Sequence, residues 1–375
     1  MRKIILIIFA VFYKYFLRNI VFLFDSEKVH DFFINLGEKI GKSYFLKRLL
    51  KSMLVKNSNS LKQSIIGINF RNPIGLAAGF DYNASLTQIL PNIGFGFGTV
   101  GTITNKSYEG NPKPRLGRLV KSKSLLVNKG FKNEGIKVIT EKLKQLNFQI
   151  PVGLSIGKTN SQNDIMTQED AVEDIISAFK TAEKSKLNIS YYELNVSCPN
   201  LIGNIEFYEP QKLDELLKAV FSLNIKKPLF IKMPISKTNE EIIKMMNVIV
   251  KYPVSGVIIG NLQKDRNNKA LVKEEVEKFS KGNFSGKPTE EKSNELIKLV
   301  YESFGDRLII IGCGGVFSAN DAYKKIKLGA SLVQLITGLI FEGPQLVSQI
   351  NLELPKLLKK DGFTNISQAV GKSSI

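Results

Sequence analysis

The feature that most constrains the fold of this 375-residue chain is a regular alternation of short apolar runs with helix-like segments beyond residue 64. The runs are rich in β-branched and aromatic residues, which is typical of buried parallel strands. Eight strands in β–α alternation predict a (β/α)8 TIM barrel. The strands are predicted at Ile74–Ala77, Phe95–Val100, Val152–Ile156, Tyr192–Val196, Leu229–Met233, Gly256–Ile259, Leu308–Ile311 and Leu332–Ile336, with helices among them at Glu134–Leu146, Ala171–Ser185, Lys212–Leu223 and Glu290–Phe304.

A small hairpin is predicted over Ile65–Phe70, before the first barrel strand. The alternative fold is a doubly wound sheet, in which a glycine-rich fingerprint follows the first strand. The segment Ala77–Asp81 does not carry that fingerprint, which favours the barrel.

In such a barrel the active site lies at the carboxyl ends of the strands. The last two strands lead into Gly312–Gly315 and Thr337–Gly338, where barrels commonly bind a phosphate through backbone N–H groups. Together with Lys232 after the fifth strand and several carboxamides, these segments predict a flavin mononucleotide (FMN) site. The other residues predicted at strand ends are Ala78, Gly79, Thr102, Thr104, Ser155, Asn195 to Asn200 and Asn261.

The loop after the fourth strand holds a thiol between two carboxamides, in Asn195-Val196-Ser197-Cys198-Pro199-Asn200. Pro199 has no backbone N–H, so the strand ends before it. From these residues alone two interpretations stay open. Cys198 is either a reactive thiol in a catalytic loop or a buried free cysteine beside turn-forming asparagines.

The composition limits which side chains could take part in catalysis. Two cysteines, Cys198 and Cys313, offer no disulfide framework and indicate a reducing compartment. The single histidine, His30, nearly excludes a histidine-based triad or a histidine-rich metal site, and no metal ligands are predicted. We interpret His30 as structural and Cys313 as a small filler of its glycine loop. Proton transfer must then use Cys, Ser, Lys, Tyr or a carboxylate.

The N-terminal segment predicts a membrane anchor. Ile4–Tyr13 is an uninterrupted apolar run, but a spanning helix needs roughly 20 such residues. Lys14, Arg18 and Asn19 interrupt the apolar residues that follow. A secretory signal peptide would be followed by a small-x-small cleavage site, and the sequence has none here. We therefore expect a helix that lies on the membrane surface or inserts marginally, with basic residues at the lipid head groups.

Two short amphipathic helices are predicted between Asp25 and Leu54. They either form a hydrophobic slot on the bilayer or simply pack on the main domain. The polar segment Lys56–Gln63 is predicted to be a linker. The expected organisation is therefore a membrane-associated extension over residues 1–63 and an FMN-binding catalytic barrel over residues 64–375.

Several motifs taken together resemble the dihydroorotate dehydrogenase family. The resemblance runs from about Phe22 to Gly371, and Phe24–His30 is similar to the membrane-associated, quinone-linked branch of the family. The motifs are Asn72–Asp81, Gly101–Thr104, Gly110–Arg115, Ser285–Pro288, Gly312–Val316 and Gly329–Leu335.

The resemblance implies that FMN oxidises dihydroorotate to orotate in pyrimidine (UMP) synthesis and passes the electrons to a quinone. Cys198 would be the base that takes a proton from C5 while hydride leaves C6 for the flavin. Asn128, Asn195, Asn200 and Asn261 would hold the pyrimidine ring and its carboxylate. The residues that would contact FMN are Ala78, Gly79, Thr102, Ser155, Asn195, Lys232, Gly286, Gly314, Gly315 and Thr337.

The chain departs from the quinone-linked pattern mainly on the substrate side. Cys198 stands where that branch normally has serine, and cysteine is typical of the soluble branch. Tyr82 stands where the branch has a lysine, and a phenol cannot supply that positive charge. In Val127-Asn128-Lys129-Gly130-Phe131 the expected Asn-x-x-Gly spacing is one residue short, and Lys129 is a candidate for the missing charge. Leu262 replaces threonine and Ser155 replaces asparagine.

These observations leave an alternative substrate open, namely another dihydropyrimidine with a different electron acceptor. The formal charge of +19 and the basic segment Lys106–Lys132 also suggest a nucleic-acid binder, or simply a solvated basic surface. No aromatic-interleaved basic motif accompanies them, so no nucleic-acid partner is expected. The expected partners are dihydroorotate, a quinone and the cytoplasmic face of the cell membrane, to which the protein would bind peripherally.

Overall fold

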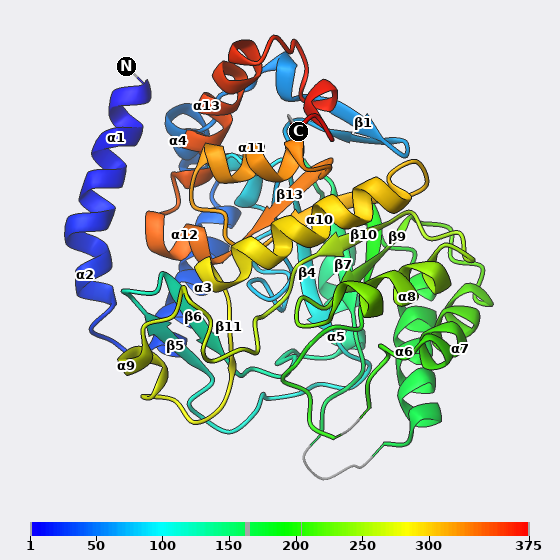
Figure 1. Ribbon diagram of the computed structural model, residues 1–375. Helices are drawn as coiled ribbons and strands as arrows, with labels where there is room; N and C mark the ends of the chain where they lie inside the picture. Colours follow the sequence, from blue (N-terminus) through cyan, green and yellow to red (C-terminus); the bar gives the residue numbers. More distant parts are fainter. Residues whose placement is uncertain (1, 162–165, 204, 374–375) are drawn as a thin grey trace.

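Eight parallel strands close into a barrel in the computed structural model, which describes residues 2–161, 166–203 and 205–373 (Figure 1). Successive barrel strands pair with one another, and β13 closes the barrel by pairing with β3. This confirms the predicted (β/α)8 architecture, because every predicted barrel strand overlaps an observed one. The barrel strands are β3 (Ile74–Leu76), β4 (Phe97–Ile103), β7 (Val152–Ile156), β8 (Tyr191–Asn195), β9 (Leu229–Met233), β10 (Gly256–Ile259), β12 (Ile309–Cys313) and β13 (Leu332–Leu335).

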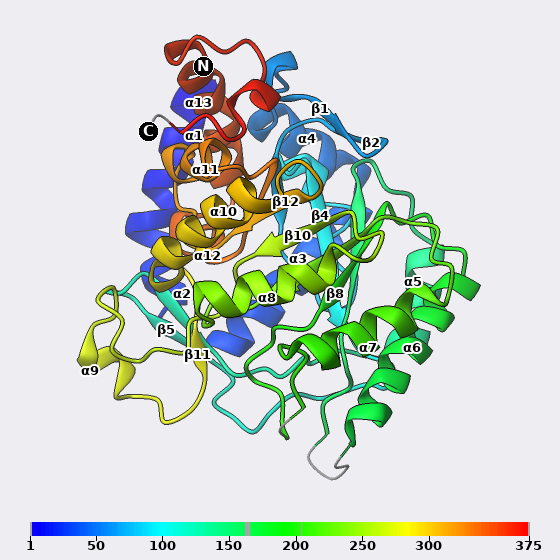
Figure 2. The same ribbon diagram turned by 45° about the vertical axis from the view of Figure 1, so that its right-hand side comes forward.

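Helices cover the outside of the barrel (Figures 1 and 2). Several begin at side chains that satisfy the free backbone N–H groups of the first turn. The Thr167 hydroxyl accepts from Asp170 N at 3.1 Å, and the Asp170 carboxylate accepts from Thr167 N at 2.9 Å. The helices after the barrel strands are α5 (Ile136–Lys144), α6 (Gln168–Lys184), α7 (Pro210–Phe221), α8 (Asn239–Ile249), α10 (Glu290–Phe304), α11 (Ala319–Lys327), α12 (Thr337–Glu342) and α13 (Leu346–Lys360).

The predicted hairpin, β1 (Gln63–Ile65) with β2 (Ile68–Phe70), closes the amino-terminal end of the barrel. Its apolar residues belong to one cluster with Phe97 and other inward-facing side chains of the barrel. The rings of Phe70 and Phe97 meet edge to face at 5.4 Å. The expected domain boundary after residue 63 falls inside β1, and the division into two domains stays a prediction.

A polar cluster fills part of the barrel interior. Thr99 Oγ1 donates to Glu193 Oε1 at 2.6 Å, and Gln334 Nε2 donates to the same oxygen at 2.8 Å. Tyr191 OH lies 2.8 Å from Thr99 Oγ1. Glu193 is fully buried, and burial raises the pKa of its carboxyl group. These side chains form the layer below the carboxyl ends of the strands.

A three-stranded antiparallel sheet lies outside the barrel, and the sequence did not predict it. It comprises β5 (Leu116–Leu119), β6 (Ser124–Val127) and β11 (Asn283–Phe284). Much of it belongs to the basic segment Lys106–Lys132, whose interpretation as a solvated surface is wrong at several positions. Arg115 and Lys132 form ion pairs with Glu27, and Lys129 is buried.

The N-terminal segment is helical without a break through α1 (Arg2–Phe12), a π-helical stretch (Tyr13–Leu17) and α2 (Arg18–Val21). Ile4–Val21 has a mean hydropathy of 1.9 and is long and apolar enough to cross a membrane. By length and composition the whole helix therefore meets the requirement that the run Ile4–Tyr13 alone does not, and the expected surface-bound or marginally inserted anchor stays a prediction.

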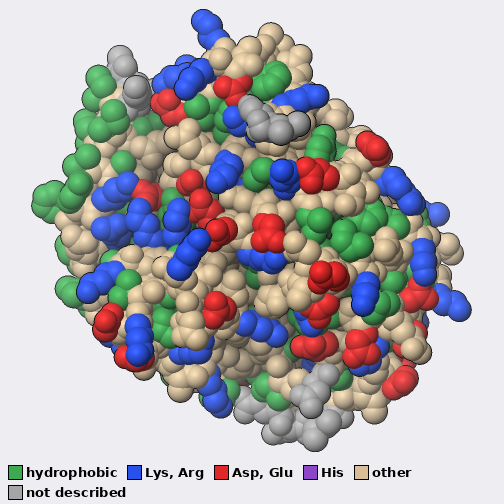
Figure 3. Space-filling view, in the orientation of Figure 1, with side chains coloured by type: hydrophobic (Ala, Val, Ile, Leu, Met, Phe, Trp, Pro, Cys, Tyr) green, Lys and Arg blue, Asp and Glu red, His purple; other side chains and the backbone are tan. Residues whose placement is uncertain are grey.

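The barrel provides partners for the two basic residues within Ile4–Val21. Lys14 forms an ion pair with Glu342, and Arg18 Nη1 donates to the Phe341 carbonyl oxygen at 3.2 Å. The opposite face of the helix is apolar and exposed, as the green left-hand edge of Figure 3 shows. Its exposed side chains include Ile4, Ile8, Val11, Phe12, Tyr15, Phe16 and Ile20.

The next two helices, α3 (Ser26–Lys42) and α4 (Tyr44–Leu54), pack against the barrel. The Asp25 carboxylate caps α3 by accepting from Glu27 N at 3.1 Å and Lys28 N at 2.9 Å. Gly37 lets α3 approach Leu86 closely, because a Cβ at this position would overlap the leucine side chain. The helices thereby wall off a cavity between themselves and the barrel.

Candidate active site

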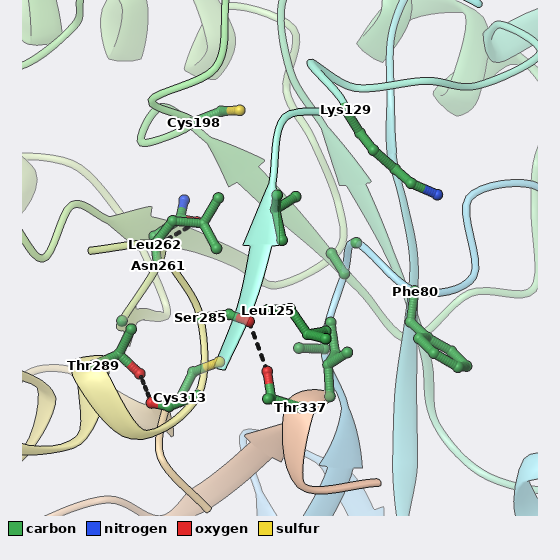
Figure 4. A pocket seen from close by; sticks show the side chains of 18 of the residues that line it. Phe80, Leu125, Lys129, Cys198, Asn261, Leu262, Ser285, Thr289, Cys313 and Thr337 are labelled. Atoms are coloured by element: carbon green, nitrogen blue, oxygen red, sulfur yellow. Dashed lines mark hydrogen bonds between the residues drawn. The ribbon is translucent and has the colours of Figure 1, made fainter. Parts of the chain in front are cut away.

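A cavity of about 160 Å³ lies at the carboxyl ends of the barrel strands (Figure 4). Leu116, Leu125 and Val127 of the antiparallel sheet line its other side. Within the described ranges, no group of His, Cys, Asp or Glu side chains could hold a metal ion. Of the predicted site residues, those that line this cavity are Ala78, Gly79, Thr102, Asn195, Cys198, Asn200, Lys232, Asn261, Gly286, Gly314, Gly315 and Thr337.

One end of the cavity is a cradle of glycine backbone. Gly286, Gly314 and Gly315 have φ values of +81°, +106° and +70°, which favour glycine. A Cβ at Gly314 would lie 2.5 Å from Thr289 Oγ1, so no larger residue fits there. Ser285 Oγ and Thr337 Oγ1 lie 2.8 Å apart at the same end (Figure 4). Exposed backbone and hydroxyl groups of this kind suit a phosphate.

A chain of hydrogen bonds links three predicted residues in the middle of the site. Asn195 Nδ2 donates to Thr102 Oγ1 at 2.8 Å, and Thr102 Oγ1 lies 2.9 Å from Ser155 Oγ. Ser155 is fully buried and does not line the cavity. Its place is therefore behind Thr102, which it orients. Lys232 lines the cavity and is 4% exposed, and its charge lowers the pKa of Glu193 against the larger effect of burial.

The loop that carries Cys198 is held by the ends of two strands. Asn261 Nδ2 donates to Ser197 Oγ at 2.6 Å, and Ser197 Oγ donates to Asn195 Oδ1 at 3.2 Å. Burial raises the pKa of the Cys198 thiol to about 11, although Lys232 and other lysines act in the opposite direction. The raised pKa favours the protonated thiol at neutral pH.

Asn128 lies behind the cavity wall. Asn111 Nδ2 donates to Asn128 Oδ1 at 3.0 Å and to the Asn200 carbonyl oxygen at 2.9 Å. Asn283 Nδ2 donates to Asn200 Oδ1 at 2.6 Å. Asn200 thus faces the cavity with its orientation fixed from both sides, whereas Asn128 supports it through Asn111.

Two residues lie in the site in ways that the sequence did not establish. The contact of His30 with the cavity was missed, and the position of Lys129 was left open. His30 lines the cavity together with Cys198, although we interpreted it as structural. Its ring meets Phe80 edge to face at 5.0 Å, and burial lowers the pKa of the imidazole well below its ordinary value. Lys129 Nζ lies 4.5 Å from the centroid of the Tyr82 ring. The sequence places His30 on an amphipathic helix, and that position did not indicate that its ring reaches the cavity.

A second cavity of about 300 Å³ adjoins the first and is enclosed by α1, α2, α3 and the barrel. Its lining is almost entirely apolar, with Arg118 as its one charged side chain among the described residues. Arg118 Nη1 donates to the Phe24 carbonyl oxygen at 2.8 Å, and its guanidinium lies 4.6 Å from the Phe22 ring centroid. The residues that line both cavities are His30, Phe80, Leu116, Leu125 and Ile340.

Comparisons with known proteins agree with this geometry. A family model for dihydroorotate dehydrogenase matches residues 60–358. Dihydroorotate dehydrogenase (quinone) of Christiangramia forsetii is 36% identical over 353 residues, which cover 93% of this chain and 99% of that protein. The Sulfurimonas denitrificans protein of the same name is 38% identical over 328 residues, covering 86% and 88%. Eimeria tenella DHODH, crystallised with ferulenol, matches with a TM-score of 0.82 at 28% identity, covering 92% and 95%.

Proposed function

The chain belongs to the dihydroorotate dehydrogenase family, and from this premise we propose that it oxidises dihydroorotate to orotate and passes the electrons to a quinone, as a step of pyrimidine (UMP) synthesis. The observation that carries the proposal is the pair of adjoining cavities. One combines a thiol, a lysine and several carboxamides with a glycine cradle, and the other is apolar. The five residues that line both cavities form the boundary between them. On one side would lie the site of substrate oxidation, and on the other the site of a lipid-soluble electron acceptor.

We propose that the first cavity holds FMN, which would accept a hydride equivalent from the substrate and deliver the electrons to the quinone. Gly286, Gly314, Gly315 and Thr337 would bind its phosphate, because their backbone and hydroxyl groups form the cradle. Ala78, Gly79, Thr102, Asn195 and Lys232 would line the ring, and Ser155 would act through Thr102.

In this proposal Cys198 is the base. It removes a proton from C5 of dihydroorotate while hydride leaves C6, so that the C5–C6 bond becomes a double bond. The sulfur must be deprotonated to act, and Lys232 favours the thiolate. Asn195, Asn200 and Asn261 are proposed to hold the pyrimidine ring through their carboxamides, and Asn128 to support Asn200 through Asn111.

The second cavity is the proposed quinone site. Its apolar walls suit a hydrophobic ring and tail, and Arg118 and neutral His30 offer N–H donors to a quinone oxygen. Phe9, Tyr13, Leu17 and Val21 of the N-terminal helix, whose other face is exposed and apolar, line this cavity. A quinone dissolved in lipid would therefore enter from the membrane side.

We further propose that the protein associates with the cytoplasmic face of the cell membrane through its N-terminal helices. The apolar face of α1 supports this association, as does the run of exposed apolar residues that continues into α4, including Tyr44 and Phe45. Basic residues on α4, among them Lys47, Arg48 and Lys51, would meet anionic head groups.

An alternative substrate is favoured by one observation. Tyr82, Val127 and Leu262 line the cavity, and all three lie where the chain departs from the family pattern. The two proposals are separated by incubating the purified, FMN-loaded protein with a soluble quinone and either dihydroorotate or dihydrouracil. Formation of orotate from dihydroorotate supports the main proposal, whereas turnover of dihydrouracil alone would support the alternative.

A further inference from the structure

Lys129 is a buried cation that forms no ion pair with any residue that the structure describes. Its side chain is 4% exposed, and its Nζ has no hydrogen-bond partner in the part of the chain that the structure describes. Burial of an ammonium group without an acceptor is costly, so such groups are normally paired. Because Lys129 lines the first cavity, a ligand there is in a position to supply the missing acceptor.

Two of the three carboxylates whose charges act on Lys129 are engaged with other partners. Glu27 Oε1 lies 3.1 Å from Lys132 Nζ and 3.3 Å from Arg115 Nη1. Asp25 accepts two backbone hydrogen bonds at the start of α3. Asp31 and Glu27 favour the charged form of Lys129 only through longer-range attraction. These carboxylates therefore do not neutralise Lys129 by direct contact.

The aromatic ring of Tyr82 compensates Lys129 only in part. The Nζ atom lies 4.5 Å from the centre of that ring, within the range of a cation–π interaction. A ring face attracts the charge but accepts no conventional hydrogen bond, so the three N–H donors stay available. Burial lowers the pKa of Lys129 to about 8, and the residue is still mainly charged at neutral pH.

We propose that Lys129, held over the Tyr82 ring, binds the carboxylate of the substrate and so selects dihydroorotate over uncharged dihydropyrimidines. This inference rests on the proposed function. Figure 4 shows Lys129 and Cys198 on one side of the cavity and Thr289, Cys313 and Thr337 on the other. The phosphate cradle and the proposed carboxylate site thus lie at opposite ends, and one cavity can accommodate both anionic groups.

The test compares orotate with uracil, which is orotate without its carboxylate. Binding of each to the FMN-loaded protein is followed by the perturbation of the flavin absorbance. Loss of a charge-assisted hydrogen bond in Lys129→Met should weaken orotate binding by about 10- to 100-fold and leave uracil binding unchanged. The matched control is Lys113→Met, which removes an exposed charge from the same basic segment and should change neither affinity.

A second variant moves the charge instead of removing it. The double variant Lys129→Met/Tyr82→Lys carries its lysine at position 82, whose tyrosine ring lies under Lys129 in the wild-type protein. This lysine should restore most of the preference for orotate. A purely structural role of Lys129 predicts equal losses for orotate and uracil and no rescue, and that result would overturn the assignment.

The outcomes also separate this inference from the proposed function. Tight orotate binding that is unchanged in Lys129→Met would overturn the role of Lys129 alone. Failure of the wild-type protein to bind orotate would overturn both.

Discussion

Asn261 holds the loop that carries Cys198 by two hydrogen bonds to Ser197. Its Nδ2 donates to Ser197 Oγ at 2.6 Å and to the Ser197 carbonyl oxygen at 3.0 Å. Asn261 follows β10 and Ser197 follows β8, so the contact passes over the end of β9, which lies between them. The thiol is thereby positioned by a rigid strand end, and not by its own loop alone.

We expect Asn261→Ala to slow flavin reduction by dihydroorotate about 10- to 100-fold, because the loop loses two hydrogen bonds and the substrate loses a carboxamide. Stopped-flow absorbance measures this step directly. Asn147→Ala, at an exposed asparagine after α5, is the control and should behave as wild type. An unchanged rate in Asn261→Ala would show that the loop needs no such support.

The pH dependence of flavin reduction tests Cys198 as the base. A base acts only when deprotonated, and burial raises the pKa of this thiol to about 11. The rate should therefore rise with pH, by about tenfold per unit well below the pKa. Cys198→Ser, with a hydroxyl of far higher pKa, should be slower over the whole range. A wild-type rate that is flat across about pH 6 to 9 would contradict the assignment.

Filling the second cavity should affect only the oxidative half of the reaction. Val29 lines this cavity, and Val29→Trp should raise the KM for a soluble quinone by about tenfold or more through steric exclusion. Flavin reduction by dihydroorotate should not change. Phe32→Trp, at a side chain on α3 that is 61% exposed, is the matched control. Normal reoxidation of Val29→Trp by quinone would place the acceptor elsewhere.

The N-terminal helix should bind vesicles through its exposed apolar face. Ile8→Asp with Phe12→Asp places two charges on that face, and co-sedimentation of the protein with anionic lipid vesicles should be largely lost. Val138→Asp changes an equally exposed apolar residue on α5 and should leave binding intact. Equal sedimentation of both variants would argue against α1 as the anchor.

Packing inside the barrel is tight enough to forbid a single methyl group. A Cβ at Gly153 would overlap the Tyr191 ring, so Gly153→Ala should destabilise the fold by about 2–3 kcal/mol. At Gly362 a Cβ meets no atom within 4 Å, and its φ of +81° alone should cost Gly362→Ala about 1 kcal/mol. Thermal unfolding compares the two variants. Equal Tm values would contradict the close packing of Gly153 against Tyr191.

The barrel was predictable from the sequence because its strands are continuous apolar runs that carry their own signal. The antiparallel sheet was not, because β11 has two residues and pairs with β6 more than 150 positions earlier. Neither strand has an apolar pattern that reveals such a distant partner. The basic residues around β5 and β6 suggested an exposed segment instead.

Most of the candidate site followed from one rule, that active sites of barrels lie at the carboxyl ends of strands. The rule could not show that His30 joins the same cavity, because α3 reaches it only through tertiary packing. It also could not separate residues that face the cavity from those one layer behind, such as Ser155 and Asn128. Nor did it show that the barrel provides a counter-ion for Lys14, since Glu342 lies more than 300 residues away in the sequence.

The most direct test of the account is anaerobic reduction of the FMN-loaded protein by dihydroorotate, followed at the flavin absorbance band. The account predicts rapid bleaching, and recovery of the absorbance when a soluble quinone is added without oxygen. A flavin that dithionite reduces but dihydroorotate does not would contradict it, because the cofactor site would then be intact while the proposed substrate is not oxidised.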